Sequence, residues 1–259
     1  MLTVTAGQIE GWIALYVWPF LRIGACLMTA PLFSASTVPA RSRLILAAAI
    51  TLVVAPLLPP TTTPMLSAEG FVVIAQQLLI GVAFGFAINL VFDALALGGQ
   101  LLANAMGLSF AFNVDPLHGA STPVLSQFYT IMATLTFLAL DGHLALLQVL
   151  VESFRTMPVG TMGLGSAGLW EMALWGSRLF SGGLMVALPG VTALLVVNLA
   201  FGVVSRAAPA LNLFAVGFPV TLVCGLVILL DSLPAMQQGF MTLLHDGLLM
   251  LGSLRPQVP

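Results

Sequence analysis

Lysine is absent from this 259-residue chain, and charge of either sign is scarce: 6% of the residues are charged, as seven arginines against nine acidic residues. Soluble domains carry about 25% charged residues, so a water-soluble fold is excluded. Without lysine the chain has neither a P-loop lysine nor a Schiff-base amine, and a net charge of −2 offers nucleic acid no basic surface. A composition that is 59% hydrophobic predicts a membrane protein.

Residues that carry catalysis or bind metals are also few. Cys26 and Cys224 each lie in an apolar run, which is typical of packing residues, and His118, His143 and His245 lack metal-ligand spacing. Neither an HExxH nor a GxSxG motif is present. We therefore expect no catalytic residue, no metal site, no cofactor and no enzymatic activity. The first residues lack a basic n-region, so we expect the first apolar segment to be retained.

The apolar segments differ in length, whereas a straight membrane span needs about 20 residues. Segment 44–58 is short for a crossing and suits a helix packed against other protein. Segment 170–204 is too long, so we expect it to kink at Pro189 or to project beyond the bilayer. The last third predicts a long helical hairpin with its tip at 206–212, and the fold class is all-α membrane protein. The segments are 9–30, 44–58, 71–97, 124–140, 144–154, 170–204, 211–230 and 236–251.

Arg22 and Asp93 are the ionised side chains within apolar segments that we consider as candidate sites. Arg22 is near the middle of the first segment, where a charge costs about 2.5–3.5 kcal/mol, so it must face protein, water or a carboxylate unless it reaches an interface. Asp93 is a site candidate by default, but pairing with an arginine of this or a neighbouring subunit is the preferred interpretation. Small and polar residues recur near Asp93 at helical spacing, which is typical of tight helix contact: Gly81, Gly85, Asn89, Gln100 and Asn104.

The stretch 98–122 interrupts the apolar pattern. It passes Met106-Gly107 and reaches Asp115-Pro116, a strong helix breaker, before His118-Gly119. From these residues alone, an exposed turn with two incidental phenylalanines is at least as good an interpretation as a functional insert. A glycine-rich stretch at 159–168 is the predicted internal boundary, which divides the chain into 1–168 and 169–259.

Three blocks of residues resemble one known family. They are Arg22 with Ala30–Phe33 and Val38–Arg43; Met106-Gly107 and Asp115-Pro116 with Ser153-Phe154 and Pro158; and Val197–Ala200 with Arg206–Phe214 and Gly217–Pro219. Together they resemble the FliR family, membrane subunits of the flagellar type III export gate. Ala210 departs from the glutamine common in the family, and Gly217–Leu222, GFPVTL, resembles the flagellar branch.

The resemblance implies a FliP-like part, residues 1–168, that carries a plug loop at 106–122, followed by a FliQ-like long helical hairpin at 169–259. It implies long kinked helices and a hetero-oligomer with one copy of this chain per gate. The implied partners are FliP-type and FliQ-type subunits, FlhB-type and FlhA-type components and unfolded flagellar proteins. The implied location is the bacterial inner membrane at the flagellar basal body, with much of the assembly displaced toward the periplasm.

The resemblance also assigns roles to residues. Predicted plug residues are Met106, Phe110, Phe112, Asn113, Asp115, Pro116 and His118. Predicted interface or intramembrane polar residues are Arg22, Asp93, Gln100, Asn104, Arg206 and Asn212. Two alternatives stay open: a homologous subunit of a virulence injectisome, and a secondary transporter that binds a small solute through Asp93 and Arg22.

Overall fold

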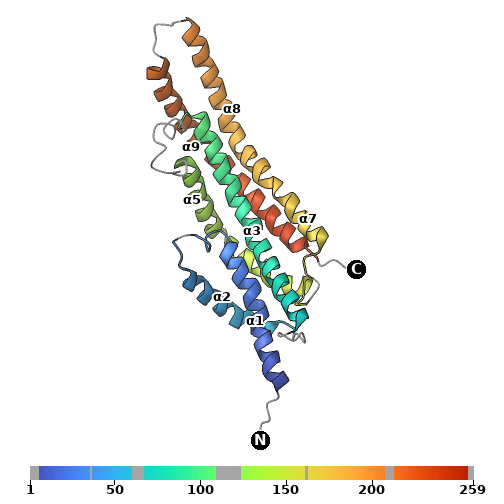
Figure 1. Ribbon diagram of the computed structural model, residues 1–259. Helices are drawn as coiled ribbons and strands as arrows, with labels where there is room; N and C mark the ends of the chain where they lie inside the picture. Colours follow the sequence, from blue (N-terminus) through green and yellow to red (C-terminus); the bar gives the residue numbers. More distant parts are fainter. Residues whose placement is uncertain are drawn as a thin grey trace. The chain divides into compact units, whose positions relative to one another are not determined.

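The computed structural model describes residues 6–35, 37–59, 67–108, 124–160, 163–207 and 213–255. Within these ranges the chain forms helices joined by turns and contains no strand, which confirms the all-α class. Figure 1 shows the helices in chain order. They are α1 (Ala6–Thr29), α2 (Ala40–Val54), the 3-10 turn η1 (Ala55–Leu57), α3 (Ala68–Ala105), α5 (Val124–Ala139), α6 (Gly142–Thr156), α7 (Ser166–Trp175), α8 (Ser177–Ala207) and α9 (Leu213–Ser253).

Several helix boundaries follow from local sequence. The Ser67 hydroxyl accepts a hydrogen bond from the backbone N–H of Gly70 at 3.0 Å, so Ser67 caps the start of α3. Asp141 adopts a left-handed conformation, φ 53°, at the bend between α5 and α6. In the described part of the chain, five helical stretches are long and apolar enough to cross a membrane, or six if this bent pair is one span.

The expectation that segment 44–58 is short for a crossing was wrong. The helix expected at 44–58 begins at Ala40, and with η1 it reaches 18 residues, which is long enough for a span. The long segment after residue 166 breaks at Gly176, whereas Pro189 lies inside α8. Likewise α9 continues through Pro234. Proline removes a single backbone hydrogen bond, and a long apolar helix tolerates that loss when its neighbours satisfy the freed carbonyl.

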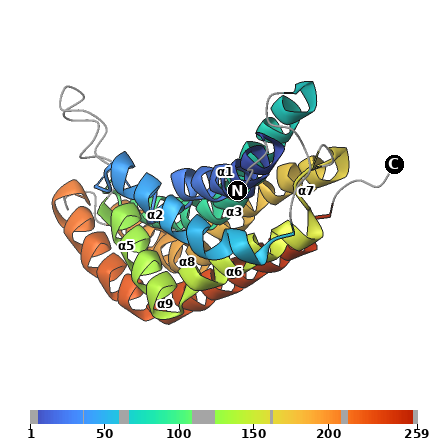
Figure 2. The same ribbon diagram turned by 90° about the horizontal axis from the view of Figure 1, so that it is seen from below.

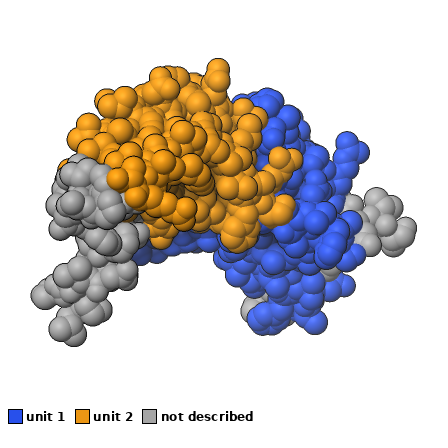
Figure 3. Space-filling view, turned by 90° about the horizontal axis from the view of Figure 1, so that it is seen from above, with its two compact units in different colours: residues 1–90, 141–176, 245–259 blue, residues 91–140, 177–244 orange. Residues whose placement is uncertain are grey.

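The chain forms two compact units, coloured in Figure 3. Unit 1 comprises residues 1–90, 141–176 and 245–259, and unit 2 comprises residues 91–140 and 177–244. Both α3 and α9 contribute residues to both units. The predicted division at residue 168 concerns likeness to other subunits, which compactness does not test, and it stays a prediction.

Unit 1 is built on close contact between α1 and the first half of α3. A Cβ added at Gly81 would overlap the carbonyl oxygen of Arg22, and one at Gly85 would lie 2.6 Å from the carbonyl oxygen of Cys26. Only glycine permits this approach of two helix backbones. The neighbouring helix α2 packs on α1 (Figure 2), and the Trp175 indole donates a hydrogen bond to the carbonyl of Ala87 at 3.1 Å.

Unit 2 contains the helical hairpin predicted from the last third of the chain. Moving along α8 from Gly182 to Gly190, the contacts on α9 run backwards from Leu243 to Ile228, so the two helices are antiparallel (Figures 1 and 2). The second half of α3 packs against both, because Phe92 makes an edge contact with Phe240 of α9 at 5.4 Å between ring centroids and Gly183 of α8 abuts α3.

Candidate functional site

The end of α3 has a defined geometry at Met106-Gly107. Gly107 has φ 79°, its N–H bonds to the carbonyl of Asn104 at 3.0 Å, and the Leu108 N–H bonds to the carbonyl of Ala103 at 3.0 Å. These two bonds with a left-handed glycine form a Schellman motif, which satisfies carbonyls that the helix end would leave unpaired. The helix therefore ends for a local reason, at the first residues of the predicted plug loop, 106–122.

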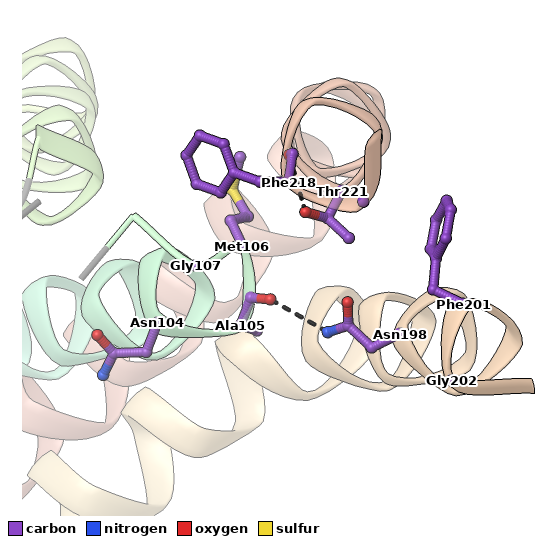
Figure 4. A pocket seen from close by; sticks show the side chains of 10 residues that line it. Asn104, Ala105, Met106, Gly107, Asn198, Phe201, Gly202, Phe218 and Thr221 are labelled. Atoms are coloured by element: carbon purple, nitrogen blue, oxygen red, sulfur yellow. Dashed lines mark hydrogen bonds between the residues drawn. The ribbon is translucent and has the colours of Figure 1, made fainter. Parts of the chain in front are cut away.

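Met106 packs this helix end against α9. Its side chain is buried, and a Cβ added at Gly225 of α9 would lie 2.5 Å from its Cγ. A flexible thioether fills such an irregular gap well. On the other side, the Asn198 amide of α8 donates a hydrogen bond to the carbonyl of Ala105 at 3.4 Å (Figure 4). The end of α3 is thus held by both arms of the hairpin.

A pocket of about 600 Å³ opens beside this helix end, within unit 2. Its volume is in the range of small-molecule sites, and none of the described residues that line it is charged. Asn104, Asn198 and Thr221 supply the polar side chains, and Figure 4 shows the elements from which the wall is built. The lining residues are Asn104, Ala105, Met106, Gly107, Asn198, Phe201, Gly202, Gly217, Phe218 and Thr221.

Unit 1 contains a second polar centre, built around Arg22. Its guanidinium is fully buried and donates three hydrogen bonds: from Nε to Gln77 Oε1 at 2.8 Å, from Nη1 to Ser153 Oγ at 3.0 Å, and from Nη2 to the Met157 carbonyl at 2.9 Å. The Phe154 ring lies under the guanidinium at 4.1 Å. These partners come from α3, from α6 and from the residue after α6.

The Arg22 centre is made of neutral acceptors. The hydrogen bonds and the ring satisfy the planar, delocalised cation without a carboxylate among its described partners. Because the side chain is buried inside unit 1, Arg22 holds α1, α3 and α6 together within the subunit itself. The prediction that Arg22 must face protein or water is met by protein of the same chain.

The other predicted residues lie in different places. Asp93, Gln100 and Asn104 are exposed on the second half of α3, and Arg206 is exposed near the end of α8. The glycines of the same sequence stripe are buried instead, Gly81 and Gly85 against α1. Glu152 and Arg155 form an ion pair, with 3.3 Å between Arg155 Nη1 and Glu152 Oε2. The remaining residues lie outside the described part of the chain: Phe110, Phe112, Asn113, Asp115, Pro116, His118 and Asn212.

Sequence reasoning missed some of the residues that build these two places. Gln77 gave a weak signal, as one of two adjacent glutamines in an otherwise apolar run, and Asn198 gave a similar one. The described residues hold no group of three metal-ligating side chains, and Cys26 and Cys224 are free thiols.

Comparison with known proteins adds to this geometry. Residues 13–247 match the family described as bacterial export proteins, family 1. This chain belongs to that family. It is 41% identical over 234 residues to the flagellar biosynthetic protein FliR of Escherichia coli (strain K12), covering 90% of each chain. It is 41% identical to FliR of Pectobacterium carotovorum subsp. carotovorum, over 90% of each, and 33% identical to FliR of Aquifex aeolicus (strain VF5), over 83% of each.

The family match covers both the Arg22 centre and the pocket beside Met106. Residues 13–247 include Arg22 and its partners as well as the pocket beside Met106. The residues matched to the family therefore include parts of both compact units.

Proposed function

We propose that this chain is a membrane subunit of the flagellar type III protein export gate, where it helps to form the conduit for unfolded flagellar proteins. The observation that carries the proposal is the similarity to FliR proteins at 41% identity over 90% of the chain. Apolar helices of span length support a membrane location, and the proposed place is the inner membrane at the flagellar basal body, with part of the assembly toward the periplasm.

The proposed partners are FliP-type and FliQ-type subunits, with FlhB-type and FlhA-type components attached. Much of the surface of α8 and α9 is apolar and exposed in the single chain, so other subunits or lipid must cover it. Residues 1–168 would take the place of a FliP-like unit and residues 169–259 that of a FliQ-like hairpin. The subunit uses no cofactor, and export is driven by other components.

The loop after Met106-Gly107 is proposed to seal the closed gate. Its phenylalanines, Phe110 and Phe112, have the size and apolarity to block a narrow pore by a hydrophobic constriction. The Schellman end of α3 and the contact of Met106 with Gly225 support this role, because they fix the point at which the loop leaves the helix. Asn113, Asp115, Pro116 and His118 complete the proposed plug.

The function is tested by complementation. An Escherichia coli strain that lacks its own FliR receives this chain on a plasmid, and swimming and secreted flagellar proteins are measured. The expected result is restored secretion and motility. The same plasmid with Arg22→Ala is the matched control, expected to give little assembled protein. Stable membrane insertion of the unaltered chain without any secretion would contradict the proposal.

A further inference from the structure

The exposed residues of α3 change in kind along the helix. From Phe71 to Phe86 every exposed side chain is apolar, and the last of them are Leu79, Val82 and Phe86. From Ala87 to Ala105 every exposed side chain is polar: Asp93, Gln100 and Asn104. The change occurs within one uninterrupted helix.

The three polar side chains share one face. Gln100 follows Asp93 by seven residues and Asn104 follows Gln100 by four, and at 3.6 residues per turn these spacings bring each side chain back to nearly the same direction. Phe86 precedes Asp93 by seven, so the apolar series belongs to the same set of helical positions. We call Asp93, Gln100 and Asn104 the polar face of α3.

The other sides of this half of α3 are already occupied. A Cβ added at Gly99 would lie 2.8 Å from the carbonyl oxygen of Leu125 in α5, and one at Gly98 would lie 3.1 Å from the carbonyl oxygen of Gly183 in α8. Phe92 contacts Phe137 and Phe240 at 5.5 Å and 5.4 Å between ring centroids. The polar face is therefore the side that the described helices of unit 2 leave open.

We propose that the polar face of α3 lines the water-filled passage of the assembled gate, and that the apolar series ending at Phe86 lies against lipid or apolar helices. The inference rests on the proposed function as a conduit subunit. Lipid contact with the polar face is unfavourable, because hydrocarbon cannot hydrogen-bond the amides of Gln100 and Asn104. Water offers donors and acceptors to both amides.

The chemistry of the face suits a passing unfolded chain. Amide side chains hydrogen-bond with water and with a peptide backbone of any sequence, and they present no apolar surface that would retain apolar segments. Asn104 also lies at the wall of the 600 Å³ pocket, so the polar face is continuous with a hollow in the surface of unit 2. A polar helix of a partner subunit is the competing occupant.

Cysteine labelling in the assembled gate tests the inference. The background replaces both native thiols, Cys26→Ala and Cys224→Ala, and then carries Gln100→Cys or Asn104→Cys. The matched controls are Leu79→Cys and Val82→Cys in the apolar series. A charged, membrane-impermeant methanethiosulfonate reagent is expected to label positions 100 and 104 at least tenfold faster than positions 79 and 82. A stalled export substrate should slow labelling at 100 and 104.

Two outcomes would overturn the inference. The first is an equal labelling rate at positions 79, 82, 100 and 104. The second is that the reagent fails to label positions 100 and 104 in a gate that still secretes. In the second case, if positions 100 and 104 are labelled only in the unassembled subunit, a helix of a partner subunit covers the polar face in the gate. Failure of the proposed function is distinguishable, because the unmodified chain would then not restore secretion.

A second arm needs no cysteine. The double variant Gln100→Leu/Asn104→Leu, in the otherwise unaltered chain, is expected to assemble normally and to secrete several-fold more slowly, because an apolar wall retains apolar segments. The control is Val82→Leu, with unchanged secretion. Full secretion by the assembled double variant would also overturn the inference.

Discussion

Arg22 combines full burial with a positive charge and three hydrogen bonds to neutral groups. A buried ion is tolerated only when its hydrogen-bonding capacity is met, and removing it leaves its partners unsatisfied in a dry site. The Gln77 side chain illustrates the cost, since its Oε1 accepts from Arg22 and its Nε2 is buried without a partner among the described residues. Arg22 therefore stabilises unit 1 by linking α1 to α3 and α6.

Replacing Arg22 by alanine is expected to destabilise the purified subunit by at least about 3 kcal/mol, because hydrogen bonds to a charged group contribute about 1.5–3 kcal/mol each. Thermal unfolding in detergent measures the change. Arg22→Lys should recover only part of the loss, since an ammonium cannot reproduce the planar fork.

The matched control at residue scale is Arg155→Ala. Arg155 makes an ion pair with Glu152 at 3.3 Å, but the two side chains are 74% and 56% exposed. Exposed pairs contribute about 0–1 kcal/mol, so this variant should unfold close to the unaltered protein. Equal losses of stability from Arg22→Ala and Arg155→Ala would contradict the proposed structural role of Arg22.

At the scale of elements, glycines determine how closely the helices pack. Gly99 brings α3 against α5, where the Ser126 hydroxyl donates a hydrogen bond to the carbonyl of Ala96 at 2.8 Å. An added methyl at Gly99 would meet backbone atoms of Leu125 and Ser126 at 2.8–2.9 Å. Backbone atoms cannot turn aside as a side chain does, so the two helices would have to separate.

Gly99→Ala is accordingly expected to destabilise the subunit by about 1–3 kcal/mol, the usual cost of overpacking. Gly252→Ala is the control, because an added Cβ there meets nothing within 4 Å and alanine favours a helix interior over glycine by up to about 1 kcal/mol. Denaturation of the two variants in the same detergent should shift in opposite directions. A loss of stability in Gly252→Ala as large as that in Gly99→Ala would contradict the packing explanation.

The loop that follows α3 is an element with a separate prediction. Deleting Phe110–Asn113 should leave assembly intact and make the membrane leak small ions, because the proposed hydrophobic constriction is removed while the fixed helix end at Gly107 is kept. Conductance of the purified gate in planar bilayers measures the leak. Unchanged conductance in an assembled deletion variant would remove the plug assignment.

Local sequence predicted the elements better than it predicted their contacts. The all-α class and the hairpin after residue 166 follow from periodicity. The predicted helix breaker was Asp115-Pro116, whereas α3 ends earlier, at Ala105. Pro234 misled, because the separate segments expected at 211–230 and 236–251 form one helix, α9, whereas Pro189 lies inside α8. The partners of Arg22 lie 55 to 135 residues away in sequence, a distance over which no spacing rule operates.

At the scale of the whole molecule, the chain exposes more apolar surface than a finished protein retains. The most apolar stretch of α9 is only 17% buried and that of α2 only 22%. Lipid covers part of such a surface, and the family assignment points to other export subunits for the rest. The single chain is thus a component that completes its burial on assembly.

Co-expression with FliP-type and FliQ-type subunits should yield a stable complex with one copy of this chain. Native mass spectrometry in detergent reports the copy number. Gly99→Ala should lower the yield of complex in parallel with subunit stability, whereas Gly252→Ala should not. Purification of the chain as a self-sufficient monomer that transports a small solute would contradict the assignment.

The length of α3 has a consequence for biosynthesis. At 1.5 Å per residue its 38 residues extend about 57 Å, whereas the hydrocarbon layer is about 30 Å thick. When the insertion machinery releases the helix, several stretches of it compete to span the bilayer, and the polar residues of its second half bias that choice without fixing it. The newly made chain would settle into its final depth only when its neighbours arrive, and an orphan copy would be a substrate for membrane quality-control proteases.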